Sequence, residues 1–342
     1  MVYSFELIKH ANIHYRESLP SLARCELFAM LFSLGIECGI ELEYMGGSRF
    51  LTFECRELTG HELSFLSGHS SVVFMAEKKN GLLSPLSAVS PAYLPDDLPE
   101  VLKYKGKTGV TFTRMMINTA ASLSAFSGLE KPLTFFDPLC GRGTACFCAM
   151  ISGMNAVGLD IDRKDVREAS DYFSRYLRLY RLKHEMLSRS ETYGKQSIPV
   201  TCFRYAAKKE SYQSGDIRTL TLACADTAAS PALFRKEKAH IIAADLPYGI
   251  QHAPQSGTKP ESLLRFLFRT LPAWKQSLYP GGSLALSFNT LTLSAEQVKD
   301  ALIHSGFVLL KNDMFNHLRH DVEHAVIRDV AFALNTEEES LI

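Results

Sequence analysis

Residues 135–144 read Phe-Phe-Asp-Pro-Leu-Cys-Gly-Arg-Gly-Thr. The apolar run that ends at Asp137 predicts a buried strand from Thr134 to Asp137. Gly141 and Gly143 then allow a tight turn in which a ligand can approach the backbone closely. A helix is expected to begin near Thr144, and its first N–H groups have no partner inside the helix. The stretch therefore predicts a strand, a turn and a helix that bind a ligand together.

Strands and helices alternate on both sides of this stretch, which is typical of a parallel α/β sheet. Most of the predicted strands end in or next to an acidic residue, and parallel sheets bind ligands at the carboxyl ends of their strands. We therefore predict a Rossmann-like sheet of seven strands. The expected strands are Thr134–Asp137, Ala156–Asp160, Leu220–Ala225, Ile241–Asp245, Leu284–Phe288, Phe307–Leu310 and Ala325–Leu334.

The first eighty residues show a different pattern, strand, helix, hairpin, helix and strand, which is the ferredoxin-like order. The longer helix is expected over Leu19–Leu34 and the hairpin turn at Gly46-Gly47. A Gly, Ser and Pro-rich stretch follows. We predict a small α+β domain over residues 1–80, a linker over 81–104 and the Rossmann-like domain over 105–342.

Composition limits the class of protein. The chain has 342 residues, of which 46% are hydrophobic and 22% charged, so it can bury two cores. Neither a run of about 18 apolar residues nor an export signal is present, which predicts a cytoplasmic protein that avoids membranes. The eight cysteines form no CxxC pair, and we expect neither a disulfide framework nor a zinc site.

The net charge of zero is unevenly distributed. Residues 1–100 carry −6 and the remainder +6, and residues 163–209 hold 12 Lys or Arg against 5 Asp or Glu. This segment is interpreted either as a phosphate-contacting surface or as the solvated face of a helix. Residues 188–209, an insert between two sheet motifs, are expected to form a mobile substrate loop, with an irregular excursion as the alternative.

A nucleoside cofactor fits the spacing of the first motif. Asp160 ends the next predicted strand, about 20 residues beyond the glycines, where a carboxylate accepts hydrogen bonds from ribose. A dinucleotide site would have a third glycine where this chain has Cys146. S-adenosylmethionine is therefore favoured over NAD.

A second motif, Asp245-Leu246-Pro247-Tyr248-Gly249, follows an apolar strand directly. The Asp245 carboxylate and the Leu246 carbonyl can each accept an N–H of an exocyclic amine, while Tyr248 stacks on the base that bears it. Holding the amine in this geometry favours its attack on a methyl group. Asp245, Leu246, Pro247 and Tyr248 are the predicted catalytic residues.

These motifs, DPLCGRGT, GLDID and DLPYG in this order, resemble those of class I S-adenosylmethionine-dependent methyltransferases. More narrowly, the chain resembles the THUMP-associated tRNA guanine-N2 methyltransferases over residues 100–334, although only a ferredoxin-like piece, and no THUMP domain, fits before residue 100. The resemblance places Asp226 on the adenine amine and Phe112 and Thr113 in a helix that closes the cofactor pocket. The implied cofactor-binding residues are Phe112, Thr113, Asp137, Pro138, Cys140, Gly141, Gly143, Thr144, Asp160, Ile161, Asp226 and Asp245.

The sequence thus predicts an enzyme that methylates an exocyclic base amine of RNA, with guanine N2 in tRNA as the preferred target. Alternatives are an amino-methyltransferase acting on rRNA or DNA, at guanine N2, adenine N6 or cytosine N4, and a non-catalytic RNA-binding protein that retains the fold. No metal is expected, because the chemistry needs none, although His317, His320 and His324 are closely spaced. Arg142 is expected to be exposed or to pair with an acidic neighbour, and Cys140 to fill the glycine turn.

Overall fold

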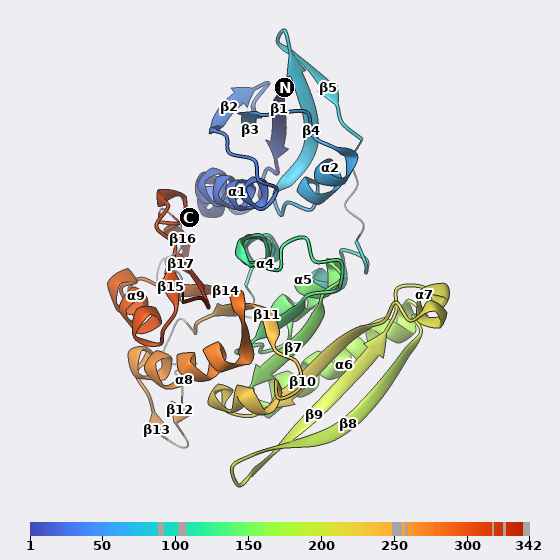
Figure 1. Cartoon of the computed structure of the whole chain (residues 1–342), viewed down its shortest axis with the longest axis vertical. Coiled ribbons are helices and arrows are strands. Elements are labelled where there is room, and N and C mark those ends of the chain that lie inside the picture. Colours follow the sequence, from blue (N-terminus) through green and yellow to red (C-terminus); the bar gives the residue numbers. More distant parts are fainter. Residues whose placement is uncertain are drawn as a thin grey trace.

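A computed structural model describes residues 1–87, 92–101, 108–247, 255–256, 259–316, 318–323 and 326–337. It contains two large sheets, one formed by the N-terminal part of the chain and one by the remainder (Figure 1). No helix in these ranges is long and apolar enough to cross a membrane.

The N-terminal sheet has the predicted ferredoxin-like order. Its strands are arranged β2-β3-β1-β4-β5, and every pair is antiparallel. The fifth strand extends this sheet to Pro85, and the predicted division of the chain at residues 80 and 105 stays a prediction. The elements are β1 (Val2–Leu7), α1 (Ile13–Ser33), β2 (Ile40–Met45), β3 (Ser48–Glu54), α2 (Gly60–Leu66), β4 (Val72–Lys79) and β5 (Leu82–Pro85).

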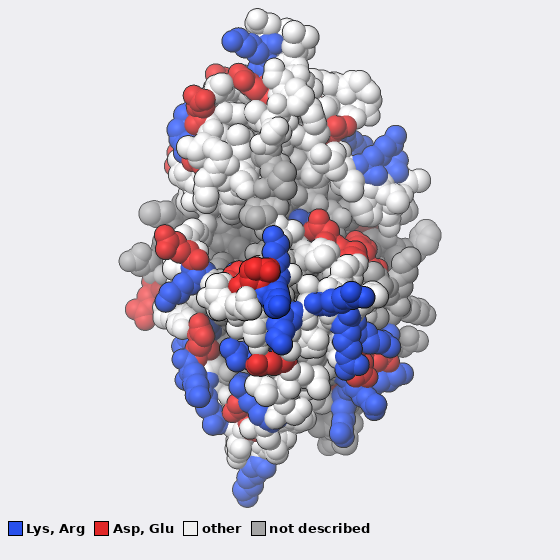
Figure 2. Space-filling view, turned by 90° about the vertical axis from the view of Figure 1, so that its right-hand side faces the viewer, with Lys and Arg blue, Asp and Glu red and all other residues white. Residues whose placement is uncertain are grey.

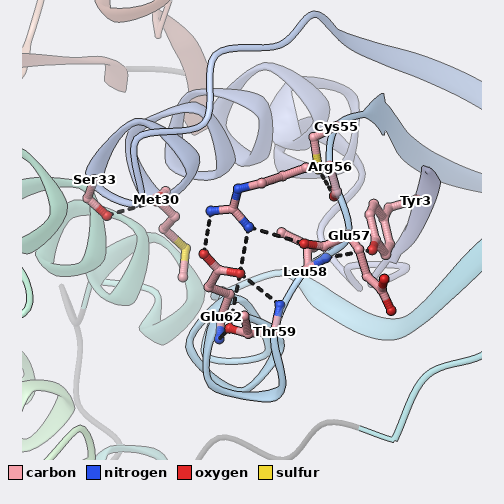
Figure 3. A network of polar contacts seen from close by, with 9 residues as sticks. All are labelled: Tyr3, Met30, Ser33, Cys55, Arg56, Glu57, Leu58, Thr59 and Glu62. Carbon is pink, nitrogen blue, oxygen red and sulfur yellow. Dashed lines mark hydrogen bonds and ion pairs between the residues drawn. The ribbon is translucent and has the colours of Figure 1, made fainter.

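Both helices of this sheet begin at residues whose side chains cap them. The Asn12 side chain accepts a hydrogen bond from the Tyr15 N–H, so α1 begins six residues before the predicted Leu19. At α2, Thr59 and Glu62 form a capping box, and the Arg56 guanidinium binds the same Glu62 carboxylate at 2.6 Å (Figure 3). The cap thus joins α2 to the loop before it.

The second sheet contains all seven predicted strands, in the order β15-β17-β14-β11-β6-β7-β10. The five strands from β14 to β10 are parallel, and β17 runs antiparallel to β14 and β15. Their bounds are β6 (Thr134–Asp137), β7 (Asn155–Asp160), β10 (Arg218–Cys224), β11 (Ala239–Asp245), β14 (Leu278–Asn289), β15 (Val308–Leu309) and β17 (Val326–Leu334).

Helices cover both faces of the parallel part of this sheet, where most residues are buried. Consecutive residues of β6 point to opposite faces: Phe135 packs in a cluster with α4, α5 and α6, whereas Phe136 packs with α8 and α9. The continuous apolar runs of the parallel strands follow from this double burial. The connecting helices are short α3 (Leu98–Val101), α4 (Val110–Leu123), α5 (Thr144–Ile151), α6 (Arg163–Leu179), α7 (Lys209–Ser214), α8 (Leu263–Ser277) and α9 (Ala295–His304), with the 3-10 turns η1 (Thr227–Ala232) and η3 (Asp313–Phe315).

The expectation of a loop or irregular excursion over residues 188–209 is wrong. These residues belong mostly to a long hairpin, β8 (His184–Tyr193) and β9 (Gln196–Tyr205), which adds two strands beyond β10. β9 pairs with β10 antiparallel, so that Ile198, Val200 and Tyr205 are buried against the domain. With β16 (His320–Glu323), the sheet has ten strands where seven were predicted. A further short pair is β12 (Gln255–Ser256) and β13 (Lys259–Pro260).

The N-terminal sheet docks on the second through α1, which packs along α4. Glu26 of α1 is fully buried at this interface, and Asn118 of α4 donates a hydrogen bond to its carboxylate at 2.7 Å. The Ser70 N–H donates to the same oxygen at 2.7 Å, and His69 lies 3.5 Å from the second oxygen. This network fixes α4 against the N-terminal domain, and the beginning of α4 reaches the site described below.

Candidate functional site

Four acidic side chains lie at one edge of the second sheet. Asp137, Asp160 and Asp245 are the last residues of β6, β7 and β11, and Asp226 follows β10. The strands are parallel and adjacent, so their carboxyl ends meet at the same edge, as the sequence predicted. Burial raises the pKa of the Asp137 carboxyl to about 8, and the charges of Asp160 and Asp245 add to this rise.

The glycine turn binds directly to the second of these acids. The Gly141 N–H donates to Asp160 Oδ2 at 2.7 Å, and the Asp162 N–H donates to Oδ1 at 2.9 Å. Gly143, the N-cap residue of α5, has a φ of 88°, and a Cβ there would lie 3.1 Å from the Phe147 ring. The positive φ and the close approach of Phe147 both require glycine at position 143. The turn can then bring backbone N–H groups and the Asp160 carboxylate to one ligand.

Cys140 and Gly158 pack against each other beneath this turn. The Cys140 side chain is buried, and burial raises the pKa of its thiol well above the usual range. A Cβ on Gly158 would lie 2.9 Å from the Cys140 sulfur and 3.0 Å from that of Cys146. Gly158 was not among the predicted site residues, although its position in a strand is the sequence signal for a close approach.

The remaining residues of the turn have structural contacts. Arg142 pairs with Asp165 at 3.0 Å and Glu168 at 2.9 Å, so of the two predicted alternatives, exposure and an acidic partner, the structure shows the acidic partner. Pro138 and Thr144 are buried, whereas the Ile161 side chain is 54% exposed beside Asp160. Ile161 therefore has the most exposed side chain among these four residues.

Asp245 is fixed by two residues that the sequence analysis did not identify. The Thr108 hydroxyl, just before α4, donates to Asp245 Oδ2, and Arg328 Nη2 of β17 lies 3.7 Å from the same oxygen. Leu246 is buried, and its N–H donates to the Ser287 carbonyl at 2.9 Å. The strand end that bears the predicted amine acceptors is thus held from both sides. Tyr248 and Gly249 lie outside the described residues.

Phe112 and Thr113 of α4 are both buried. The Arg328 guanidinium lies over the Phe112 ring at 4.5 Å from its centroid, which orients the cation beside Asp245. The Thr113 hydroxyl donates to the Gly109 carbonyl of its own helix at 3.1 Å. Phe112 therefore acts on the site through its contact with Arg328. The sequence around residue 328 contains no pattern that identifies this arginine as a site residue.

The Asp226 carboxylate already binds other groups. Arg269 of α8 donates from Nη1 to both Asp226 oxygens, at 2.8 and 2.9 Å, and the Ala228 N–H donates to Oδ1 at 2.8 Å. Arg269 also binds Glu261 at 2.9 Å. An adenine amine would have to share Asp226 with this arginine, a partner that sequence reasoning missed because 43 residues separate the two.

The site suits a ligand that carries positive charge. Asp137 and Asp160 have no ion-pair partner within the described ranges, and burial raises the pKa of both carboxyls. S-adenosylmethionine has a sulfonium and an ammonium group, and either would stabilise the ionised carboxylates. The residues present therefore fit this cofactor.

Metal ligands do not gather in the described part of the chain, where no three His, Cys, Asp or Glu side chains are arranged to hold an ion. His317 and His324 lie outside the described residues. His320 packs against Phe112, with 5.2 Å between ring centroids, and burial lowers its pKa to about 4. This histidine is thus a neutral, buried part of the wall behind Arg328.

The sheet topology, the glycine turn and the acidic strand ends define a class I S-adenosylmethionine-dependent methyltransferase. Residues 112–300 match a family model described as "RMKL-like, methyltransferase domain", and the chain belongs to this family.

Solved structures that align with this chain include several methyltransferases. The crystal structure of TrmN from Thermus thermophilus aligns with a TM-score of 0.39 and 17% identity over 87% of this chain and 59% of TrmN. The rRNA methyltransferase aviRa from Streptomyces viridochromogenes aligns with a TM-score of 0.40 and 14% identity, covering 70% of this chain and 92% of aviRa. This chain thus spans about three fifths of the length of TrmN. No curated protein sequence matches it.

Proposed function

We propose that this enzyme transfers a methyl group from S-adenosylmethionine to an exocyclic amine of a base in RNA, and that the target is the N2 amine of guanine in tRNA. The observation that carries this proposal is the anchored strand end at Asp245 and Leu246. It offers a carboxylate and a backbone carbonyl next to the buried acids that fit a cationic cofactor.

The geometry supports a reaction by positioning. Asp245 accepts one N–H of the amine and the Leu246 carbonyl accepts the other, which turns the nitrogen lone pair toward the cofactor side of the site. S-adenosylmethionine supplies the electrophilic methyl group when bound, and the electron pair of the breaking carbon–sulfur bond stays on sulfur. A new nitrogen–carbon bond forms, and the surplus proton on nitrogen leaves through Asp245 to solvent.

Other residues of the chain position Asp245, the cofactor and the base. Arg328 and Thr108 contact Asp245 Oδ2, which fixes the carboxylate at the end of β11. Asp137 and Asp160 bind the cofactor's methionine and ribose parts, and the glycine turn supplies backbone N–H groups beside them. Tyr248, which follows Pro247 directly, stacks on the base in this proposal.

Methyl transfer from tritium-labelled cofactor tests the function. Purified protein is incubated separately with bulk tRNA, rRNA and DNA, and the labelled product is digested to nucleosides and identified by mass spectrometry. We expect label in tRNA as N2-methylguanosine. Label confined to DNA, or to an adenine or cytosine amine, would exclude the guanine target, and cofactor binding without transfer to any nucleic acid would support the non-catalytic alternative.

A further inference from the structure

One face of α6 carries five exposed cations, Arg163, Lys164, Arg167, Arg175 and Arg178, which we name the α6 cationic face. At 3.6 residues per turn these positions fall within an arc of about 120°. The opposite side of the helix carries its buried apolar residues, which include Phe173 and Leu177. The helix therefore presents its cations together, as one row directed away from the core.

The carboxylates of α6 do not neutralise this row. Asp162 accepts hydrogen bonds from the first N–H groups of the helix, and Asp165 and Glu168 bind Arg142 on the glycine turn. Asp171 alone shares the cationic face, at 3.6 Å from Arg167, and both side chains are largely exposed. An ion pair as exposed as this one contributes little to stability.

The two arginines of the neighbouring hairpin strands each lie beside a carboxylate. Arg189 pairs with Glu191 at 3.2 Å, and Arg204 pairs with Glu185 at 3.3 Å. In the described part of the chain, by contrast, Lys164, Arg175 and Arg178 form no ion pair. Like charges three or four residues apart destabilise a helix, as for Lys164 with Arg167 and Arg175 with Arg178. A polyanion bound along the row would remove this repulsion.

The row begins at the site. Arg163 lies three residues after Asp160, and Arg163, Lys164 and Arg167 line one open hollow at the beginning of α6. From there the row extends for about 22 Å to Arg178, since a helix rises 1.5 Å per residue. Figure 2, which looks onto the β8–β9 side, shows Lys and Arg side chains more numerous over the lower, methyltransferase part than over the upper part.

We propose that the α6 cationic face binds the sugar–phosphate backbone of the RNA substrate, on the side of the cofactor site away from Asp245. This inference rests on the proposed function and adds how the substrate is held. The cations would contact successive phosphates, so the contribution to affinity is independent of base sequence and falls as salt concentration rises.

The test uses the full chain with Arg167→Gln, Arg175→Gln and Arg178→Gln combined. The matched control combines Lys9→Gln, Arg24→Gln and Lys79→Gln, three exposed residues of the N-terminal domain that lower the net charge equally. Binding of bulk tRNA is measured by fluorescence anisotropy over a salt series, KM and kcat for tRNA by tritium transfer, and cofactor affinity by calorimetry.

We expect the α6 variant to raise the KM for tRNA at least tenfold and to lower the slope of log K against log salt by about one for each lost phosphate contact. Its kcat and cofactor affinity should match those of the wild type, because no altered residue touches the reacting groups. The N-terminal control should keep the wild-type KM and slope.

The outcomes separate the two proposals. If the wild type methylates tRNA and the α6 variant keeps both KM and salt slope, the α6 cationic face does not bind RNA, while the proposed function stands. An equal loss in the N-terminal control would show a net-charge effect and would also overturn the inference. If the wild type transfers no methyl group to RNA, the proposed function fails first, and the surface has no RNA substrate to hold.

Discussion

Nη2 of Arg328 lies 3.7 Å from Oδ2 of Asp245, across β14, which separates the strands that carry the two residues. The arginine is almost fully buried, and its guanidinium rests on Phe112 at 4.5 Å. Separating the two side chains would leave a buried charge without its partner, which is strongly destabilising. The pair therefore fixes the position of Asp245 as well as its environment.

Replacing Arg328 should therefore impair chemistry more than cofactor binding. We expect Arg328→Lys to lower kcat by about 10-fold to 100-fold, because a shift of about 1 Å in a positioning group can cost that much. Arg218→Lys is the matched control, since Arg218 also stacks on an aromatic ring, Tyr93 at 4.3 Å, and pairs with Asp216 at 2.5 Å. Steady-state kinetics, with folding checked by circular dichroism, measures both. Equal kcat losses in the two variants would assign Arg328 a general structural role.

Asp245 itself is predicted to act in transfer and not in cofactor retention. Asp245→Ala should lower kcat by about 100-fold or more, since a positioned proton acceptor typically contributes that much. Calorimetry should find its affinity for S-adenosylmethionine unchanged. Transfer at the wild-type rate by the variant would remove Asp245 from its proposed role.

Cofactor affinity should rise with pH. The raised pKa of Asp137, about 8, means that its carboxyl is mostly protonated at pH 7 in the absence of a ligand. A cation beside it favours the ionised form, so binding releases a proton and tightens as pH rises, by up to about tenfold between pH 6 and 7. Calorimetry in buffers of different ionisation enthalpy counts the released proton. Asp137→Asn should bind independently of pH in this range, and a wild type that does likewise would contradict the raised pKa.

Gly158 is predicted to be indispensable beneath the glycine turn. Gly158→Ala places a methyl group 2.9 Å from the Cys140 sulfur, and overpacking of this kind costs about 1–3 kcal/mol. We expect a lower melting temperature together with weaker cofactor binding, because the turn above Cys140 must shift. Gly39→Ala, where the added methyl would meet no atom within 4 Å, serves as the control and should leave both quantities unchanged.

The capping box of α2 should stabilise the N-terminal domain in a pH-dependent way. Hydrogen bonds from Arg56 are the main cause that lowers the pKa of Glu62 to about 2. The carboxylate therefore contributes stability above about pH 4.5, and this contribution is lost as pH falls toward 2. Glu62→Ala should cost about 1 kcal/mol at pH 7, as for other caps, and less at pH 3.

Thermal unfolding at the two pH values measures this difference. Glu17→Ala is a suitable comparison, because Glu17 also pairs with an arginine, Arg49 at 3.0 Å, but is 68% exposed and caps no helix. It should change stability by less than about 0.5 kcal/mol. A cost for Glu62→Ala that is the same at both pH values would show that its ionisation is irrelevant.

The sequence contains local signals for two features that were predicted wrongly, the beginning of α1 and the β8–β9 hairpin. Asn12 is a good N-cap residue, yet the beginning of α1 was predicted from apolar spacing alone, at Leu19. The β8–β9 hairpin was obscured because apolar Met186 and Leu187 lie at exposed positions, whereas Ile198, Val200 and Tyr205 are buried, so that burial does not follow the apolar pattern. The Gly194 turn, with a φ of 58°, was the local sign of a hairpin.

The sequence by itself determined the features that depend on a few neighbouring residues. These are the glycine turn after β6, the acidic residues at or just after the ends of β6, β7, β10 and β11 and the ferredoxin-like order of the first sheet, because backbone sterics and hydrophobic periodicity act locally. Only the tertiary structure decided which distant side chains meet: Arg328 with Asp245, Arg269 with Asp226, and Asn118 with Glu26. Such pairs depend on strand order, register and helix packing, which place residues together that no spacing along the chain relates.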